Sequence, residues 1–177
     1  PLPFHTGRKP YEQIAFQFSH HIYHKDGRIE HANQYINTTA GEFPNFEFIE
    51  QLQKALSKDE GTIFKFATHE NTILNAIRAQ LKKSDAPNKE SLISFIESIS
   101  HHTKKNPDTW IVPNRKQNQG TREMVDLCKV VVKYYYNPHT FGSKSIKKVL
   151  PAVLKSSQFV QEKYSRPINE IQVTSIN

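Results

Sequence analysis

The sequence predicts an α/β or α+β domain in which a hairpin leads a small mixed sheet and helices pack on it. Three observations support this fold class. An alternating apolar segment ends at an Asp-Gly turn, several segments carry apolar residues at helical spacing, and one short apolar run lies between two of these segments. The expected order of elements is β-β-α-β-α-α-α-α. A chain of 177 residues can bury its own core, so we expect one domain over residues 1–177.

The hairpin is the first predicted element. Residues 11–23 approximate the alternation of a strand. The residues expected on one face of that strand are Ile14, Phe16 and Phe18. Asp26-Gly27 is typical of a tight hairpin turn, and residues 29–36 should return as the second strand.

Helices dominate the rest of the chain. The elements expected up to residue 102 are a helix that follows Pro44-Asn45 and is ended by Glu60-Gly61, a short and mostly buried strand at 62–67, a helix capped by Asn71 or Thr72, and a helix at 90–102. Residues 104–120 are polar. A long helix should then start at Thr121 or Arg122, a shorter helix should span 145–154, and residues 155–177 should form an irregular tail.

Composition narrows the classes of function. A net charge of +7 fits a DNA or RNA partner, although many basic domains bind neither. One cysteine, Cys128, excludes internal disulfides and a cysteine-based zinc cluster. The sequence contains no apolar run that could span a bilayer and no signal peptide, so we expect a cytoplasmic protein with no membrane partner.

Glu70 is the first candidate site residue. It follows the predicted strand at 62–67 directly, and ligands of α/β sheets gather at the carboxyl ends of strands. A carboxylate there, beside His69 and Asn71, could bind a hard divalent cation. The alternative is that Glu70 interacts with the first-turn N–H groups of its own helix.

Asp126 is the second candidate. It lies between apolar residues early in a predicted helix, so its carboxylate is either solvated or directed at a metal. Two acids from different helices, Glu70 and Asp126, would make half of a two-metal nuclease site that uses Mg²⁺ or Mn²⁺.

The segment from Tyr134 to Leu154 is the third candidate. Helix N-termini favour anions, so lysines in the first turn of a helix indicate a surface that meets phosphate. The residues expected to contact nucleic acid there are Ser143, Lys144, Ser145, Lys147 and Lys148, with Tyr136 as a base-stacking platform. Lys144 and Lys148, four apart, should share a helix face. The alternative is that the lysines simply form a solvated outer face of the helix.

Several stretches resemble a bacterial family known as domain of unknown function 2779. They are residues 6–19, 68–72, 124–127 and 142–151. That family is similar to the ribonuclease-H-like 3′–5′ exonucleases, which use four acidic residues and two divalent metals. The resemblance implies a ribonuclease-H-like mixed sheet and, as a partner, a fused RecB-like or Cas4-like nuclease domain.

The resemblance also implies roles for single residues. Glu70 takes the place of the second-motif acid, with Asn71 beside it as a nucleic-acid contact, and Asp126 that of a later acid. The family's first motif, Asp-Phe-Glu, and its last acidic motif are not in the sequence; they should lie before Pro1 and beyond Asn177. We therefore expect a fragment without the first strand and C-terminal motif, with weak or no Mg²⁺ or Mn²⁺ binding and no activity by itself.

Three hypotheses follow for the function. The first is the core of a metal-dependent nuclease that hydrolyses phosphodiesters of single-stranded nucleic acid. The second is a non-catalytic nucleic-acid-binding module that serves a partner or fused nuclease. The third is a protein-interaction domain in which the positive charge is incidental.

Overall fold

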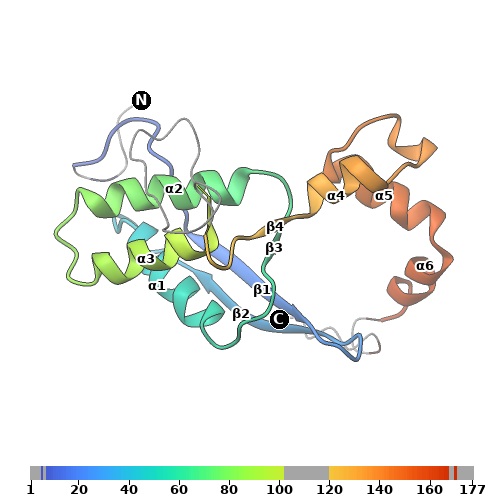
Figure 1. Cartoon of the computed structure of the whole chain (residues 1–177), viewed down its shortest axis with the longest axis horizontal. Helices are drawn as coiled ribbons and strands as arrows, with labels where there is room; N and C mark the ends of the chain where they lie inside the picture. The colour runs from blue at the N-terminus through green and yellow to red at the C-terminus, as the bar shows by residue number, and fades with distance from the viewer. Residues whose placement is uncertain (1–4, 6, 102–119, 168–169, 171–177) are drawn as a thin grey trace. The chain divides into compact units, whose positions relative to one another are not determined.

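The computed structural model describes residue 5, residues 7–101, residues 120–167 and residue 170. The predicted polar segment at 104–120 therefore lies almost wholly outside the described residues. The architecture is mixed α/β, with two small sheets and several helices (Figure 1). The chain divides into two compact units, a first unit of residues 1–18 and 34–125 and a second unit of residues 19–33 and 126–177.

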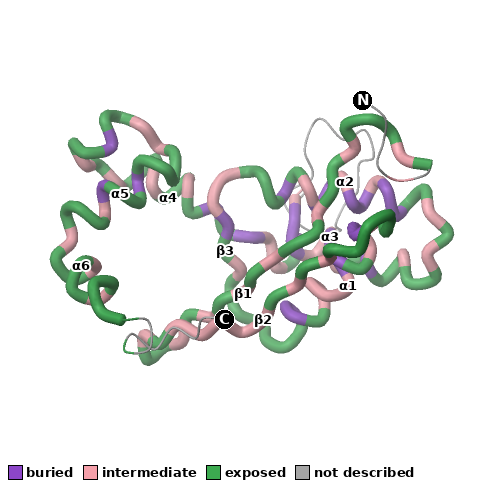
Figure 2. Tube along the Cα trace, turned by 180° about the vertical axis from the view of Figure 1, so that it is seen from behind, coloured by how far each residue is buried: buried purple, intermediate pink, exposed green. Residues whose placement is uncertain are grey.

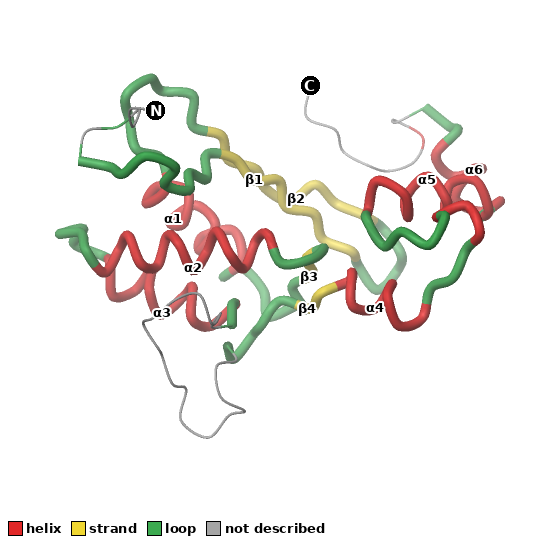
Figure 3. Tube along the Cα trace, turned by 90° about the horizontal axis from the view of Figure 1, so that it is seen from above, coloured by secondary structure: helices red, strands yellow, loops and turns green. Residues whose placement is uncertain are grey.

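The predicted hairpin is present. Strands β1 (Gln17–Tyr23) and β2 (Ile29–Ile36) form a two-stranded antiparallel sheet (Figure 3). Gly27 takes a φ of 85°, which a glycine adopts without strain, and its N–H donates to the His24 carbonyl oxygen over 2.9 Å. The Asp-Gly turn and the bounds of β2 are confirmed.

The predicted strand starts too early, because residues before Gln17 follow a different path. The Asn45 side chain accepts a hydrogen bond from the Ala15 N–H over 2.7 Å and donates one to the Gln13 carbonyl over 2.9 Å. Ala15 consequently packs on the core, while Ile14 and Phe16 are exposed. The expectation that Ile14 and Phe16 share the inner face of Phe18 is therefore wrong.

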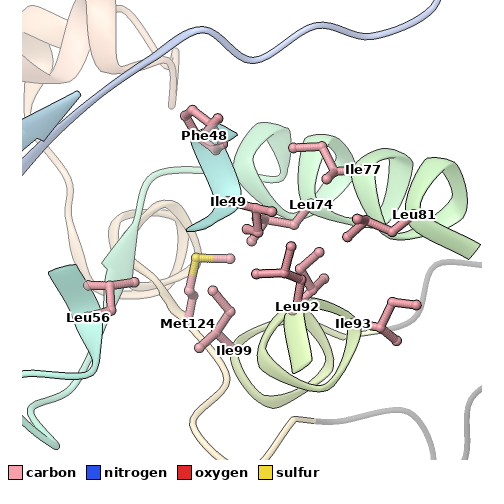
Figure 4. Packing of buried hydrophobic residues seen from close by; sticks show 11 residues of the cluster. Phe48, Ile49, Leu56, Leu74, Ile77, Leu81, Leu92, Ile93, Ile99 and Met124 are labelled. Atoms are coloured by element: carbon pink, nitrogen blue, oxygen red, sulfur yellow. The ribbon is translucent and has the colours of Figure 1, made fainter. Parts of the chain in front are cut away.

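Three helices build the first unit: α1 (Asn45–Leu56), α2 (His69–Lys82) and α3 (Lys89–Ile99). Helix α2 packs against α3, and α1 contacts both. Their apolar stripes meet in one cluster, with side chains directed toward one another (Figure 4). The buried members are Phe48, Ile49, Leu56, Leu74, Ile77, Leu81, Leu92, Ile93, Ile96, Ile99 and Met124.

Helix α2 begins earlier than predicted. Its N-cap is Thr68, which makes no side-chain capping hydrogen bond, so capping by Asn71 or Thr72 is wrong. Both residues lie inside the helix, and the Thr72 hydroxyl donates to the Thr68 carbonyl over 3.0 Å.

A second, short sheet pairs β3 (Phe64–Lys65) with β4 (Val125–Asp126). The Val125 N–H donates to the Ile63 carbonyl over 2.8 Å. The predicted helix start at Thr121 or Arg122 is wrong, because the backbone there bonds to the end of α3 instead. The N–H of Arg122 donates to the Ser98 carbonyl and that of Met124 to the Ile99 carbonyl, over 2.7 and 3.0 Å.

Gly120 opens this returning segment. Its N–H donates to the Ser100 carbonyl over 3.0 Å, and a Cβ at this position would clash with the backbone of Glu97 and Ser98. The close approach of two backbones thus requires glycine here.

The second unit consists of the hairpin tip, α4 (Leu127–Tyr134), a 3₁₀ turn η1 (Pro138–Thr140), α5 (Ile146–Ser156) and α6 (Gln158–Tyr164). Helix α5 packs on η1 and on α6. The expected irregular tail is wrong over α6, where the Ser157 hydroxyl accepts a hydrogen bond from the Val160 N–H and caps a further helix.

Candidate nucleic-acid interface

Glu70 is exposed and is the second residue of α2. An acid in the first turn of a helix interacts favourably with the partial positive charge of the unpaired N–H groups. This geometry matches the local alternative stated for Glu70, and it leaves the carboxylate accessible to solvent.

Asn71, predicted to contact nucleic acid, is used inside the protein. Its side chain is 1% exposed. The amide oxygen accepts from the His101 N–H over 2.9 Å, and the amide nitrogen donates to the His101 carbonyl over 3.0 Å. Asn71 thereby joins α2 to the residues after α3, and it does not belong to the exposed surface considered below.

Asp126 is buried, with 8% of its surface exposed, and is the N-cap of α4. Its carboxylate accepts a hydrogen bond from the Cys128 N–H over 2.9 Å. Aspartate is among the residues most favoured at this position. The structure thus adds a reading absent from the sequence-based alternatives: a buried capping carboxylate, and not a solvated one.

The predicted Mg²⁺ or Mn²⁺ site finds no cluster of three ligands among the described residues. Glu70 belongs to the first unit and Asp126 to the second. Across residues 7–101 and 120–167, no three His, Cys, Asp or Glu side chains are grouped so that they could hold a metal ion. Hard divalent cations need about six oxygen ligands. Joint metal binding by the two acids therefore stays a prediction.

Cations do occupy the first turn of α5. The helix begins at Ile146 after the N-cap Ser145, which makes no side-chain capping bond, and its first turn contains no acid. Lys147, Lys148 and Ser145 are all exposed. The predicted mismatch between the helix dipole and its charges is confirmed for the two lysines.

Lys144 and Ser143 lie before this helix and have partners within the protein. Lys144 is half-buried, and its ammonium donates to the Tyr135 carbonyl at the end of α4 over 3.4 Å. The Ser143 hydroxyl accepts from the Ser145 N–H over 3.3 Å. The expectation that Lys144 and Lys148 share one helix face is wrong, because Lys144 precedes the helix.

The aromatic residues around this loop differ in exposure. Tyr134 and Tyr136 are exposed, Tyr136 to 86%, whereas Tyr135 is half-buried with its hydroxyl inside. The exposure of Tyr136 is compatible with the predicted stacking role. Phe141, also 86% exposed, was missed. The signal in the sequence was a phenylalanine before Gly142 in a loop, where burial is uncommon.

The charge of residues 126–166 is strongly positive. The acids are Asp126 and Glu162, and the basic residues are Lys129, Lys133, Lys144, Lys147, Lys148, Lys155, Lys163 and Arg166. Two of the lysines lie over neighbouring rings, Lys133 at 5.0 Å from the Tyr134 centroid and Lys163 at 5.8 Å from that of Tyr164. Lysines and exposed rings are thus interleaved along this part of the chain.

Comparison with known proteins places the chain in a family. No helix in the described part has both the length and the apolar composition of a membrane span. Searches of curated proteins and of solved structures found no match. Residues 1–145 match the family described as Domain of unknown function (DUF2779), and the match ends at the N-cap of α5. Because the match covers most of its length, the chain belongs to the DUF2779 family.

Proposed function

We propose that the second unit binds single-stranded nucleic acid, DNA or RNA. The observation that carries this proposal is the pair of exposed lysines, Lys147 and Lys148, in a first helical turn without acids. They lie in a segment of the chain where basic residues far outnumber acids.

The electrostatic argument starts from the free protein. A cation near a helix N-terminus opposes the helix dipole, with an energy of about 0.3–1 kcal/mol at an exposed site. A bound phosphate reverses the sign of this interaction, because both the ammonium groups and the first-turn N–H groups then face an anion. Lys147 and Lys148 are thus better suited to the bound state than to the free one.

The aromatic argument concerns the bases. Tyr134 and Tyr136 are exposed, and both shortly precede the lysine-rich segment in the sequence. Stacking of a base on such a ring contributes about 1–3 kcal/mol and tolerates any base. Surfaces that bind single strands usually combine basic side chains, which contact the phosphate backbone of the nucleic acid, with aromatic rings, which stack on its bases.

The test is the salt dependence of binding to labelled single-stranded DNA and RNA, followed by fluorescence anisotropy. Neutralising Lys147 and Lys148 with glutamine should reduce the slope of log affinity against log salt by about 1.4, roughly 0.7 for each lost phosphate contact. The matched control is Lys54→Gln with Lys58→Gln, two exposed lysines of the first unit.

Equal slopes for the parent and the Lys147/Lys148 variant would contradict the proposal. Binding that neither pair of substitutions changes would favour the protein-interaction hypothesis, in which the charge is incidental.

A second candidate is a metal-dependent nuclease. What favours it is that the paired strands β3 and β4 each lead to a helix whose start carries an acid, Glu70 in α2 and Asp126 at α4. Further carboxylates would be needed for metal binding, so cleavage is expected only from a longer chain that supplies them. The measurement is the rate at which that longer chain cleaves single strands in the presence of Mn²⁺. If Glu70→Ala and Asp126→Asn cleave as fast as the parent protein, this candidate is rejected.

A further inference from the structure

Phe141 has an unusual combination of backbone and side chain. Its φ and ψ of 51° and 39° place it in the left-handed region, which bulky residues rarely adopt. Its ring is 86% exposed, so no burial of apolar surface offsets the backbone strain. The folded chain is stabilised by neither the backbone nor the ring at this position.

The strained conformation is fixed by its surroundings. Phe141 donates its N–H to the Pro138 carbonyl over 3.0 Å, and the Ser143 N–H donates to the Thr140 carbonyl over 3.0 Å. The Asn137 side chain accepts from the His139 N–H and donates to the Ser156 hydroxyl of α5, both over 2.9 Å. Thr140, directly before Phe141, is buried. The backbone that carries the exposed ring is therefore held by an ordered loop.

Strain and exposure alone do not select Phe141. Tyr11, in the first unit, has a φ of 62° and is 83% exposed. Phe141 differs in its setting, because it shortly precedes Lys147 and Lys148 in the lysine-rich part of the chain. Tyr136, which precedes η1 in the chain where Phe141 follows it, exposes a second ring.

We propose that Phe141 is a stacking platform for an unpaired base, carried by an ordered loop. The inference rests on the proposed nucleic-acid function and adds a residue and a substrate class to it. Because the backbone at Phe141 is already ordered, binding does not have to order the loop that carries the ring. Phenylalanine has no hydrogen-bonding group, so the platform accepts any base but needs an exposed base face. Its contribution should therefore apply to single strands and not to duplexes.

The central variant is Phe141→Asn, since asparagine tolerates the left-handed region and removes the ring. Single-strand affinity should fall by about 5- to 100-fold, the loss of one stacked base. The salt slope should not change, because no phosphate contact is lost. The midpoint of thermal unfolding should rise by about 2–4 °C as the strain is relieved.

The matched control is Tyr11→Asn, which removes an equally exposed ring from an equally uncommon backbone conformation. It should raise the midpoint of unfolding in the same way and leave affinity unchanged. A second variant, Phe141→Trp, keeps a ring and should retain affinity. Trp110, the one tryptophan of the sequence, is replaced by phenylalanine in this variant so that the fluorescence reports on position 141 alone. Its fluorescence should be quenched when oligothymidine is added.

The outcomes separate this inference from the proposed function. If Phe141→Asn binds as the parent does while the lysine variant shows the reduced salt slope, the platform is rejected and the lysine surface stands. If the lysine variant also binds as the parent, the proposed function itself fails. Equal loss of single-strand and duplex binding, or a lowered midpoint of unfolding in Phe141→Asn, would also reject the platform.

Discussion

The two units of this protein differ in how far their apolar side chains are buried. In the first unit the apolar stripes of α1, α2 and α3 meet in one buried cluster. In the described part of the second unit, the buried apolar side chains are Val149 and Ala152. Figure 2 shows the contrast, with buried positions concentrated on α1–α3 and mostly exposed or intermediate positions along α4–α6.

The exposed apolar residues of the second unit are numerous and large. They include Leu127, Val130, Val132, Tyr134, Tyr136, Phe141, Ile146, Leu150, Leu154, Phe159 and Tyr164. A segment that leaves so much apolar surface in contact with water gains little from the hydrophobic effect. The difference indicates that apolar burial stabilises the first unit more than it stabilises the described part of the second.

The largest expected effect tests the core directly. Leu81→Ala in α2 removes a side chain with no exposed surface and should cost about 2–5 kcal/mol of unfolding free energy. The same change at Leu150 in α5, which is 54% exposed, should cost less than about 1 kcal/mol. Denaturant unfolding followed by circular dichroism measures both. Similar losses at the two leucines would break the comparison between the units.

A smaller effect is expected at Asn71. Asn71→Ala removes both hydrogen bonds to the His101 backbone from a buried site and should cost about 1–3 kcal/mol. Single-strand affinity and its salt slope should stay as in the parent, because the amide group is not on the surface. A reduced salt slope in a variant of unchanged stability would return Asn71 to the binding surface.

Asp126 separates a capping role from a metal role. Asparagine caps helices about as well as aspartate, so Asp126→Asn should keep the cap and cost less than Asp126→Ala, which should lose about 1 kcal/mol from the cap alone. Thermal unfolding of both variants measures the difference. If Asp126→Asn destabilises as much as Asp126→Ala, the negative charge itself matters, and a role beyond the cap gains support.

The smallest effect concerns pH and the first unit. Burial, together with the hydrogen bond from the Tyr35 hydroxyl to Glu47 at 2.8 Å, raises the pKa of Tyr35 from 10.0 to about 12. Because the raised pKa means that the folded state holds this proton more tightly than the unfolded state, it stabilises the fold. This stabilisation is fully present below pH 10.0 and is lost as the pH rises toward 12. An ultraviolet titration should show one late phenolate that is absent in Tyr35→Phe. Persistence of that phenolate in Tyr35→Phe would refute the assignment.

The fold was predictable where a local pattern agreed with the packing. The Asp-Gly turn, β2 and the stripes of α1, α2 and α3 follow from spacing alone. The start of α4 did not follow from spacing, because the backbone from Arg122 to Val125 is held by carbonyls of Ser98, Ile99 and Ile63, which are distant in sequence. Periodicity carries no information on such partners.

The candidate site shows the same division. The lysines in the first turn of α5 follow from the sequence, since a helix start and its charges are local features. The inward use of Asn71 and Lys144 depends on His101 and Tyr135, which only the folded backbone brings near. The exposure of Phe141 could be expected from its place in a loop before Gly142, but its left-handed backbone could not, because that conformation at a phenylalanine has no sequence signature.

Gly120 has a consequence for genetic experiments. Its close contact with the backbone of Ser98 fixes where the returning segment starts, and so which residues become β4 and the cap of α4. Any side chain at position 120 should shift that alignment and disturb Asp126 indirectly. In a screen for loss of function, Gly120 should therefore score as strongly as a residue of the proposed binding surface, because a side chain there disturbs the fold.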